Sequence, residues 1–227
     1  AKNHSKGDSL VYTSMTGIKS RVHQVSHTYA IIGFQMNEHQ LAIGETTFLG
    51  REELWDKNKP LKYWELMELA LLRAKTAREA IEVITSLVEQ YGYGSEGESF
   101  SIADPNEAWV LELIGTGGSG SAIWVAMKVP DGMITAHANH SRIGEFPMDD
   151  PENCTYSDNV ISFAIEKGYY NPDIDGFDAR FKLDALIKID GVDYKKGKIS
   201  LLGSSLHNNI AKSYQIVFYG ETVALSD

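Results

Sequence analysis

The chain has 227 residues, of which 43% are hydrophobic and 23% charged, so it can form a folded core and does not have the composition of a disordered chain. Its 21 basic and 31 acidic side chains leave a net charge of −10 without any Lys/Arg-rich run, which argues against nucleic acid as a partner. No apolar run approaches the roughly 20 residues of a membrane-spanning helix, and the single cysteine, Cys154, excludes an internal disulfide.

The beginning of the chain is polar and predicts a β-hairpin as the first clear element. Residues 1–8 contain no apolar stretch, so they are not a secretory signal, and the expected compartment is the cytoplasm. Export stays open as an alternative, because the natural N-terminus can be missing from this sequence. Short β-rich runs at residues 29–34 and 40–43 flank a polar turn at 36–39, which is typical of a hairpin.

Residues 61–91 predict two helices. Apolar side chains recur there at steps of three and four residues, which places them on one face of a helix. Thr76 and Glu79 have the spacing of a capping box, so we expect one helix to end and another to begin near Lys75. Gly92 then ends the second helix, as glycine commonly does.

The next part of the chain predicts an antiparallel meander followed by a helix and two further strands. Successive β-rich runs are separated by Asp-Pro-Asn, by a glycine-rich stretch and by Pro-Asp-Gly, all of which are turn signals. The predicted strands are residues 99–103, 108–114, 122–129, 133–138, 198–202 and 215–219, and the predicted helix is 159–167. This pattern indicates an α+β protein, in which helices pack against antiparallel sheets.

Three features that could indicate a cofactor or a nucleophile have simpler explanations. The glycine-rich residues 115–120 precede a predicted strand and lack the lysine and hydroxyl of a phosphate loop, so we predict a hairpin turn. His137 and His140 lie close together without a third ligand or an HExxH motif, so we expect no metal site. Cys154 has no neighbouring basic residue to lower its pKa, which favours a buried thiol over a nucleophile.

Two polar segments that follow predicted strands are candidates for a site. In the first, Glu45, Thr46 and Thr47 come directly after the strand at 40–43. In the second, TAHANHSR, the strand at 133–138 leads into Asn139 and Arg142. Side chains at strand ends are commonly used for binding and catalysis, and an asparagine amide can stabilise a developing oxyanion. The alternative is that both segments are polar loop ends whose side chains satisfy backbone groups.

Several long stretches resemble one known family. They are MNEHQLAIGETTFLGR, then TAREAIEVITSLVEQYGYGSEGESFSIADPNEAWVLELIG, IWVAMKVPDGMITAHANHSRI and DPENCTYSDNVISFAIEKG. In this order they closely resemble the PepD-type dipeptidases, which are cysteine-dependent members of the N-terminal-nucleophile (Ntn) hydrolase superfamily. The resemblance covers residues 22–168, in the middle of the family domain, whereas 169–227 has no recognisable place in it.

The resemblance implies a fold and a reaction. The fold is a four-layer αββα sandwich of two stacked antiparallel sheets between helices, and residues 1–227 would form a single, incomplete domain of this kind. The substrates are short peptides, chiefly dipeptides, and no metal or organic cofactor takes part. In such enzymes the side chain of the mature first residue is the nucleophile, and its own α-amine, with a pKa near 8 in model compounds, is the base. The thiolate forms an acyl-enzyme, which water then hydrolyses.

The sequence departs from the family pattern at its beginning. The family starts with a Cys-Thr pair, whereas this chain starts with Ala1 and has no such opening segment. Cys154 aligns with an interior family position and offers no α-amine. We therefore expect a fragment or subunit of a dipeptidase without its nucleophile, with an N-terminal segment missing. The alternative is a non-catalytic relative that binds peptides or has a structural role. A homo-oligomer is open in either case.

The candidate residues receive roles from the resemblance and from their charge. The resemblance implies that Asn139 stabilises the oxyanion or orients the substrate, and that Thr46 and Thr47 lie where the superfamily places an oxyanion-hole residue. From charge alone, Glu45 is a candidate for binding the free ammonium group of a dipeptide, and Arg142 for binding a carboxylate in bidentate geometry. We expect the two threonines and Asn139 to meet in one pocket, with Glu45 and Arg142 at its rim, because oxyanion donors must converge on one point.

Overall fold

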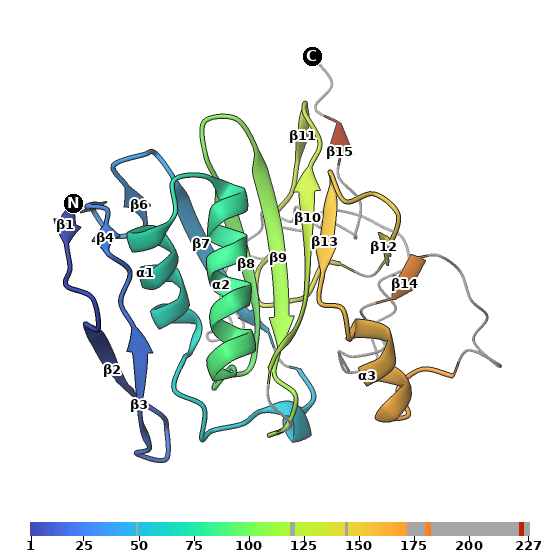
Figure 1. The fold of residues 1–227 in the computed structure, drawn as a ribbon. Coiled ribbons are helices and arrows are strands. Elements are labelled where there is room, and N and C mark those ends of the chain that lie inside the picture. The colour runs from blue at the N-terminus through green and yellow to red at the C-terminus, as the bar shows by residue number, and fades with distance from the viewer. Residues whose placement is uncertain (49, 119–120, 144, 172–179, 183–222, 225–227) are drawn as a thin grey trace, which may run out of the picture.

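The computed structural model describes residues 1–48, 50–118, 121–143, 145–171, 180–182 and 223–224, and its centre is a large antiparallel sheet (Figure 1). The sheet has seven strands in the order β13-β10-β9-β8-β7-β6-β5. Their bounds are β5 Ile31–Ile32, β6 Met36–Asn37, β7 Ala42–Phe48, β8 Gly97–Ala103, β9 Ala108–Ile114, β10 Ile123–Val129 and β13 Cys154–Tyr156. Helices α1 (Tyr63–Arg73) and α2 (Ala77–Tyr91) cover one face of this sheet, which confirms the predicted α+β class.

The middle strands are buried on both faces, and this explains their sequences. In β9, Trp109, Leu111 and Leu113 contribute to the core under α1 and α2, while Val110 and Ile114 contribute to a second core on the opposite face. Side chains alternate between faces along a strand, so a strand covered on both sides becomes a nearly continuous apolar run such as AWVLELI. The predicted strand at 108–114 is confirmed with the same bounds.

The two predicted helices are confirmed, as is the break between them. Thr76 is the N-cap of α2, and its side chain accepts a hydrogen bond from the backbone N–H of Glu79 at 3.2 Å. Gly92 follows the last residue of α2 with φ +78°, a conformation that glycine adopts without steric cost. The predicted helix at 159–167 appears as α3 (Val160–Glu166).

The predicted hairpin at 29–43 differs from the structure in its bounds. The first strand is only β5, and part of the predicted turn is the strand β6. The reason is Asn37, which is 1% exposed and donates through Nδ2 to the backbone oxygens of Leu71 and Ala74, both at 2.8 Å. These bonds hold the segment against α1. As a consequence β7 begins later than predicted and runs on through Glu45, Thr46 and Thr47.

The predicted fourth strand of the meander, residues 133–138, is wrong for most of its length. Only Met133–Ile134 is a strand, β11, and it pairs with β15 (Val223–Ala224) outside the main sheet. The place beside β10 is taken by β13, from further along the chain. The residues after β11 make side-chain hydrogen bonds to β7 and β8, which accounts for their departure from the sheet pattern.

The remaining elements lie around this sheet. They are β1 (Lys2–Asn3) paired with β4 (His27–Thr28), the hairpin of β2 (Ser9–Thr13) and β3 (Lys19–His23), the pair β12 (Glu145–Pro147) and β14 (Arg180–Lys182), and the short 3₁₀ helix η1 (Glu52–Leu54). The predicted strands at 198–202 and 215–219 lie outside the described residues. Among the described helices, none has the length and apolar character needed to cross a bilayer.

The glycine-rich residues 115–118 and 121 connect β9 and β10, as the hairpin prediction requires. Gly117 and Gly118 have φ +65° and +93°, which suits a tight connection. A Cβ at Gly117 would lie 2.4 Å from the backbone oxygen of Glu53, so only glycine fits this close approach.

Candidate active site

His137 joins two strands of the sheet through its side chain. Its Nδ1 lies 2.5 Å from Oγ1 of Thr46 on β7, and its Nε2 lies 2.6 Å from Oγ of Ser101 on β8. Burial and the nearby charge of Arg142 lower the pKa of His137 to about 4, so the ring is neutral at pH 7. A neutral imidazole has one donor and one acceptor nitrogen, and the two hydroxyls can satisfy both. His137 therefore fixes the chain after β11 on the face opposite α1 and α2.

Asn139 reaches β7 next to this histidine. Its Nδ2 donates a hydrogen bond to the backbone oxygen of Thr47 at 2.6 Å, although the two residues are 92 positions apart. Its φ of +57° is in the left-handed region, which asparagine tolerates better than most residues and which is enriched at functional sites. The structure thus brings Asn139 to the backbone of Thr47 and beside Thr46. The prediction that both threonine side chains point into one pocket with Asn139, with Glu45 and Arg142 at its rim, is wrong, because successive side chains of β7 point to opposite faces of the sheet.

Glu112 on β9 holds the end of the same segment. It is 0% exposed, and its carboxyl group accepts hydrogen bonds from the backbone N–H groups of Arg142 at 2.5 Å and Ile143 at 3.1 Å, and from Oγ of Ser99 at 2.9 Å. Burial raises the pKa of Glu112 above its usual range, and these hydrogen bonds offset part of that rise. We define residues 137–143 as the anchored loop, because side chains of β7, β8 and β9 all bind it.

The side chain of Thr47 lies on the other face of β7, where it meets a buried acid. Its Oγ1 is 2.9 Å from Oε2 of Glu98, which is 0% exposed on β8. Burial, reinforced by the neighbouring Glu45, raises the pKa of Glu98 to about 9. Glu45 shares this helix-facing side with Glu98, and its charge also acts on Tyr63 and Tyr93.

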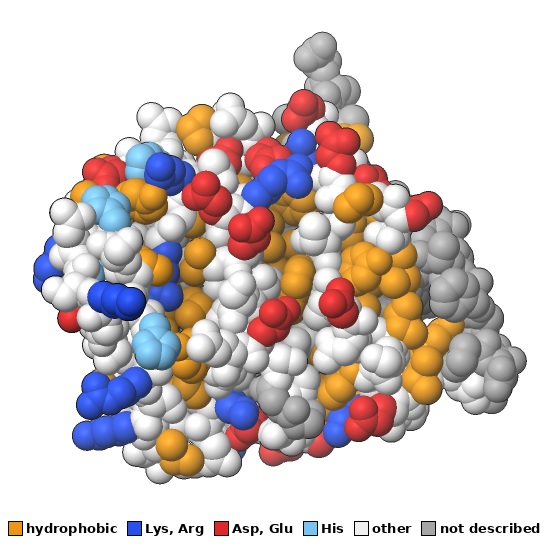
Figure 2. Space-filling model, in the orientation of Figure 1, with side chains coloured by type: hydrophobic (Ala, Val, Ile, Leu, Met, Phe, Trp, Pro, Cys, Tyr) orange, Lys and Arg blue, Asp and Glu red, His pale blue; other side chains and the backbone are white. Residues whose placement is uncertain are grey.

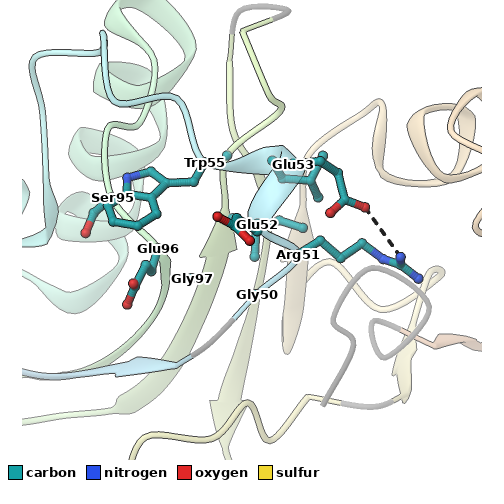
Figure 3. Close-up of a pocket in the computed structure, with 11 residues that line it drawn as sticks. Gly50, Arg51, Glu52, Glu53, Trp55, Ser95, Glu96 and Gly97 are labelled. Atoms are coloured by element: carbon teal, nitrogen blue, oxygen red, sulfur yellow. Dashed lines mark ion pairs between the residues drawn. The ribbon is translucent and has the colours of Figure 1, made fainter. Parts of the chain in front are cut away.

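A cavity of about 610 Å³ opens beyond the end of β7 (Figure 3). Arg51 stacks on the ring of Tyr169 at 3.9 Å and lies 3.5 Å from Glu53, so its charge is already engaged. The carboxylates of Glu52 and Glu96 also line the cavity, and neither makes an ion pair or hydrogen bond with the part of the chain that the structure describes. The lining residues are Gly50, Arg51, Glu52, Glu53, Leu54, Trp55, Ser95, Glu96, Gly97, Ile114 and Gly115.

The cavity begins at the end of β7, close in the register to Thr47, but none of Glu45, Thr46, Thr47, Asn139 and Arg142 lines it. Gly97, which lines the cavity, is the register partner of Phe48, and Glu98 is the partner of Thr47. In Figure 3, Glu96 and Trp55 lie on one side of the cavity and Arg51 lies on the other, where it extends toward Glu53. Glu52 lies between the two sides. The free carboxylates are therefore separated from the arginine, and this part of the cavity is suited to a cationic group.

Arg142 and Cys154 have well-defined surroundings. Arg142 is held by its backbone N–H on Glu112, and its guanidinium lowers the pKa values of His137 and His140. Cys154 is 2% exposed, and burial together with Asp150 raises its pKa to about 12, which confirms the buried thiol predicted from the sequence. Three or more His, Cys, Asp or Glu side chains do not gather in metal-binding geometry anywhere in the described ranges.

Sequence reasoning missed the residues that support the loop. Ser101, Glu98 and Glu112 were not candidates, and His137 was considered only as a metal ligand. A signal was present, because Glu112 interrupts the otherwise apolar strand AWVLELI, and Glu98 in GESFSIA shares a face with the apolar Phe100 and Ile102. A charged residue in a strand covered on both faces needs a specific partner, so such an interruption marks a position worth testing.

Comparison with known proteins identifies the family. The sequence model of peptidase family C69 matches residues 7–189, which is most of the chain. The chain belongs to peptidase family C69. The match extends beyond residues 22–168 on both sides and includes part of the segment after 168 that the resemblance had left unplaced.

Three relatives carry dipeptidase names. A probable dipeptidase B of Lactococcus lactis subsp. lactis (strain IL1403) is 32% identical over 120 residues, 52% of this chain and 23% of the relative. A probable dipeptidase of Latilactobacillus sakei is 27% identical over 173 residues, 72% of this chain and 33% of the relative. A probable dipeptidase of Salmonella dublin is 32% identical over 105 residues, 46% and 23% of the two chains. The chain thus spans a quarter to a third of the relatives that it matches.

Proposed function

We propose that the protein containing this chain is a dipeptidase of the N-terminal-nucleophile type and that this chain supplies the oxyanion site and part of the substrate cavity. The observation that carries the proposal is the hydrogen bond from Asn139 Nδ2 to the backbone oxygen of Thr47. Membership of a peptidase family and the names of the relatives support it. The nucleophile is proposed to be the cysteine with which the family domain begins.

The strand geometry supports two converging donors at this point. The backbone N–H of Ile43 donates to the oxygen of Gln35 at 3.0 Å, so the backbone groups of Ile43 point away from β8. Backbone direction alternates along an antiparallel strand, so Thr47 points the same way, and its oxygen accepts from Asn139 on that side. The N–H of Thr47 and the second hydrogen on Asn139 Nδ2 therefore share one edge, where both can donate to an oxyanion.

In the proposed reaction a cysteine thiolate attacks the peptide carbonyl and its oxygen becomes negatively charged. The two donors stabilise that charge, the amine product leaves, and water hydrolyses the acyl-enzyme. Thr46 keeps the anchored loop in place through His137. Arg142 is the proposed group for the carboxylate end of the substrate. Of the two candidates for its ammonium end, Glu45 and the pair of Glu52 and Glu96, the pair is favoured because both of its carboxylates line the cavity.

We also propose that the sheet is one half of an αββα sandwich within a single domain. Asn37 bonds to α1, so its neighbour Met36 and the paired Ile32 lie on the opposite face of the sheet, as Gly44 and Thr46 do. Ile32 is 58% and Met36 43% exposed, and a Cβ added at Gly44 would meet no atom within 4 Å. An apolar, uncovered sheet face of this kind is suited to packing against a second sheet.

The experiment for the function is an assay of the natural protein that contains this chain, with a panel of dipeptides and their N-acetylated forms. We expect hydrolysis of the free dipeptides and inactivation by a thiol alkylator, with the label on an N-terminal cysteine. Figure 2 shows acidic side chains across the centre of the helix-covered face, and basic ones near β2 and β3 and along the upper and lower edges. Charges of both signs are therefore interspersed on this face, which does not favour an anionic ligand there. Dipeptide binding without any turnover would favour the non-catalytic alternative.

The cavity gives a prediction about substrate charge. Replacing Glu52 and Glu96 together by glutamine is expected to raise KM about tenfold for free dipeptides, because the ammonium group loses two unpaired carboxylates, and to leave kcat within about twofold. The matched control is the double change Glu82→Gln and Glu89→Gln, which removes the same charge from exposed positions of α2. If KM responds to Glu45→Gln instead and not to the cavity variant, the ammonium is bound at Glu45.

A further inference from the structure

Glu98 has no role in the proposed mechanism, yet it is the buried acid closest to the oxyanion site. It is 0% exposed, its Oε2 is 2.9 Å from Oγ1 of Thr47, and its Oε1 is buried without a hydrogen-bond partner among the residues described. The titratable groups that face it are Glu45 from β7, Tyr63 from α1 and Tyr93 from the segment after α2. In the described ranges no lysine, arginine or histidine lies within ion-pair distance of it.

Glu112 is a second buried acid in the same sheet, and more hydrogen-bond donors surround its carboxyl group than surround that of Glu98. Two backbone N–H groups and one hydroxyl donate to Glu112. Glu98 has one hydrogen bond and a second carboxyl group as its neighbour. A buried charge without a counter-ion or sufficient donors is strongly disfavoured. The surroundings of Glu112 therefore tolerate an ionised carboxylate better than those of Glu98, which favour the neutral acid.

We propose that Glu98 is a positioning residue that holds Thr47 for catalysis and that it does so as a neutral carboxylic acid. The proposal rests on the proposed function, because it concerns the residue whose N–H faces the oxyanion. The neutral acid keeps the hydrogen bond to Oγ1 of Thr47, which fixes the side chain and hence the direction of the Thr47 backbone. It also leaves no negative charge behind the strand where the oxyanion forms.

Loss of the proton reverses the second benefit, while the hydrogen bond remains because the hydroxyl of Thr47 is its donor. A carboxylate at Glu98 lies beside Glu45 and opposes the negative charge of the transition state, so activity is present below the pKa of Glu98 and is lost as the pH rises through it. The raised pKa, about 9, puts this loss on the alkaline side of neutrality. The α-amine of an N-terminal nucleophile works in the opposite sense, since it becomes a better base as the pH rises through about 8.

The protonation state is tested first, in the natural protein that contains this chain. At pH 7 the infrared carbonyl absorption of a buried carboxylic acid is expected in the wild-type protein and is expected to disappear in Glu98→Gln. The coupling to Thr47 is tested by NMR, where Glu98→Leu shifts the Thr47 amide resonance and Glu98→Gln shifts it much less. The proposal is overturned if the infrared spectrum at pH 7 lacks the carboxylic-acid band, or if the Thr47 amide resonance does not shift in Glu98→Leu.

The catalytic part is tested in the natural protein with a dipeptide substrate. Glu98→Leu is expected to lower kcat about tenfold with KM nearly unchanged, and Glu98→Gln to restore most of kcat and to remove the fall in kcat above about pH 9. An alkaline fall that persists unchanged in Glu98→Gln overturns the proposal. If the wild-type protein hydrolyses no dipeptide, the proposed function fails, while the infrared and NMR results still decide whether Glu98 is neutral and coupled to Thr47.

Discussion

Asn139→Ala is expected to lower kcat for dipeptide hydrolysis by about 10²–10³-fold, with little change in KM, because removing one preorganised oxyanion donor has an effect of this size in other hydrolases. The amide nitrogen of Asn139 is 2.6 Å from the oxygen of Thr47, so it is already oriented before substrate binds. The measurement is the steady-state rate of the natural protein carrying the change, compared with the unchanged protein.

The control for this variant is Asn106→Ala, which removes an exposed asparagine side chain from the turn between β8 and β9. Its kcat is expected to equal that of the unchanged protein. Asn139 is also exposed, so its replacement removes little packing, and the melting temperature should stay close to the wild-type value. A loss of kcat below about threefold would contradict the oxyanion role and favour the polar-loop interpretation.

The second large effect is expected at Glu112. Glu112→Gln replaces one carboxyl oxygen by an NH₂ group that faces an N–H or O–H donor, so at least one buried donor loses its acceptor. The free energy of unfolding is expected to fall by about 2–4 kcal/mol, since each buried unsatisfied group costs about 1–3 kcal/mol. Urea unfolding of the chain, followed by circular dichroism, measures this difference.

Glu98→Gln is the matched control, because the same chemical change in the same sheet is expected to have the opposite sign. The unfolded chain loses its Glu98 proton near 4.5, whereas the folded chain keeps it to about 9. Wild-type stability therefore falls as the pH rises between these values, by at most about 1.4 kcal/mol per unit. At pH 7 the variant is expected to gain up to about 3 kcal/mol (2.5 units), and at pH 4 to gain none. Equal losses in both variants would contradict the distinction between the two acids.

Helices and central strands could be predicted because local pattern and packing agree there. The step of three to four apolar residues in α2 and the cap at Thr76 are local signals, and both are confirmed. Apart from Glu112, β9 is a continuous apolar run because it is covered on both faces. By contrast, residues 135–138 have a strand-like sequence but are held by Thr46 and Ser101 through His137, and no local pattern encodes a partner 91 residues away.

The candidate site could be predicted only in part, because its polar residues are visible in the sequence whereas their contacts with distant segments are not. Asn139 and the two threonines stood out as polar residues near strand ends, although β7 in fact contains Thr46 and Thr47. The strand tolerates them because each hydroxyl has a partner, His137 on one face and Glu98 on the other. Glu98 and Glu112 could not receive roles from sequence, because the number of donors around a buried acid depends on packing between distant segments.

The separation of Asn139 from Thr47 along the chain has a consequence for folding. The α1–α2 pair and the β8–β9–β10 hairpins join neighbours in sequence, whereas the contact with Thr47 closes a loop of 92 residues. Contacts between distant segments carry a larger entropic penalty and tend to form after local ones. During synthesis β7 leaves the ribosome long before Asn139 does, so the sheet can exist for a time without the contact between Thr47 and Asn139. If Asn139 and Thr47 form the oxyanion site as proposed, hydrolysis begins only after this late contact has closed.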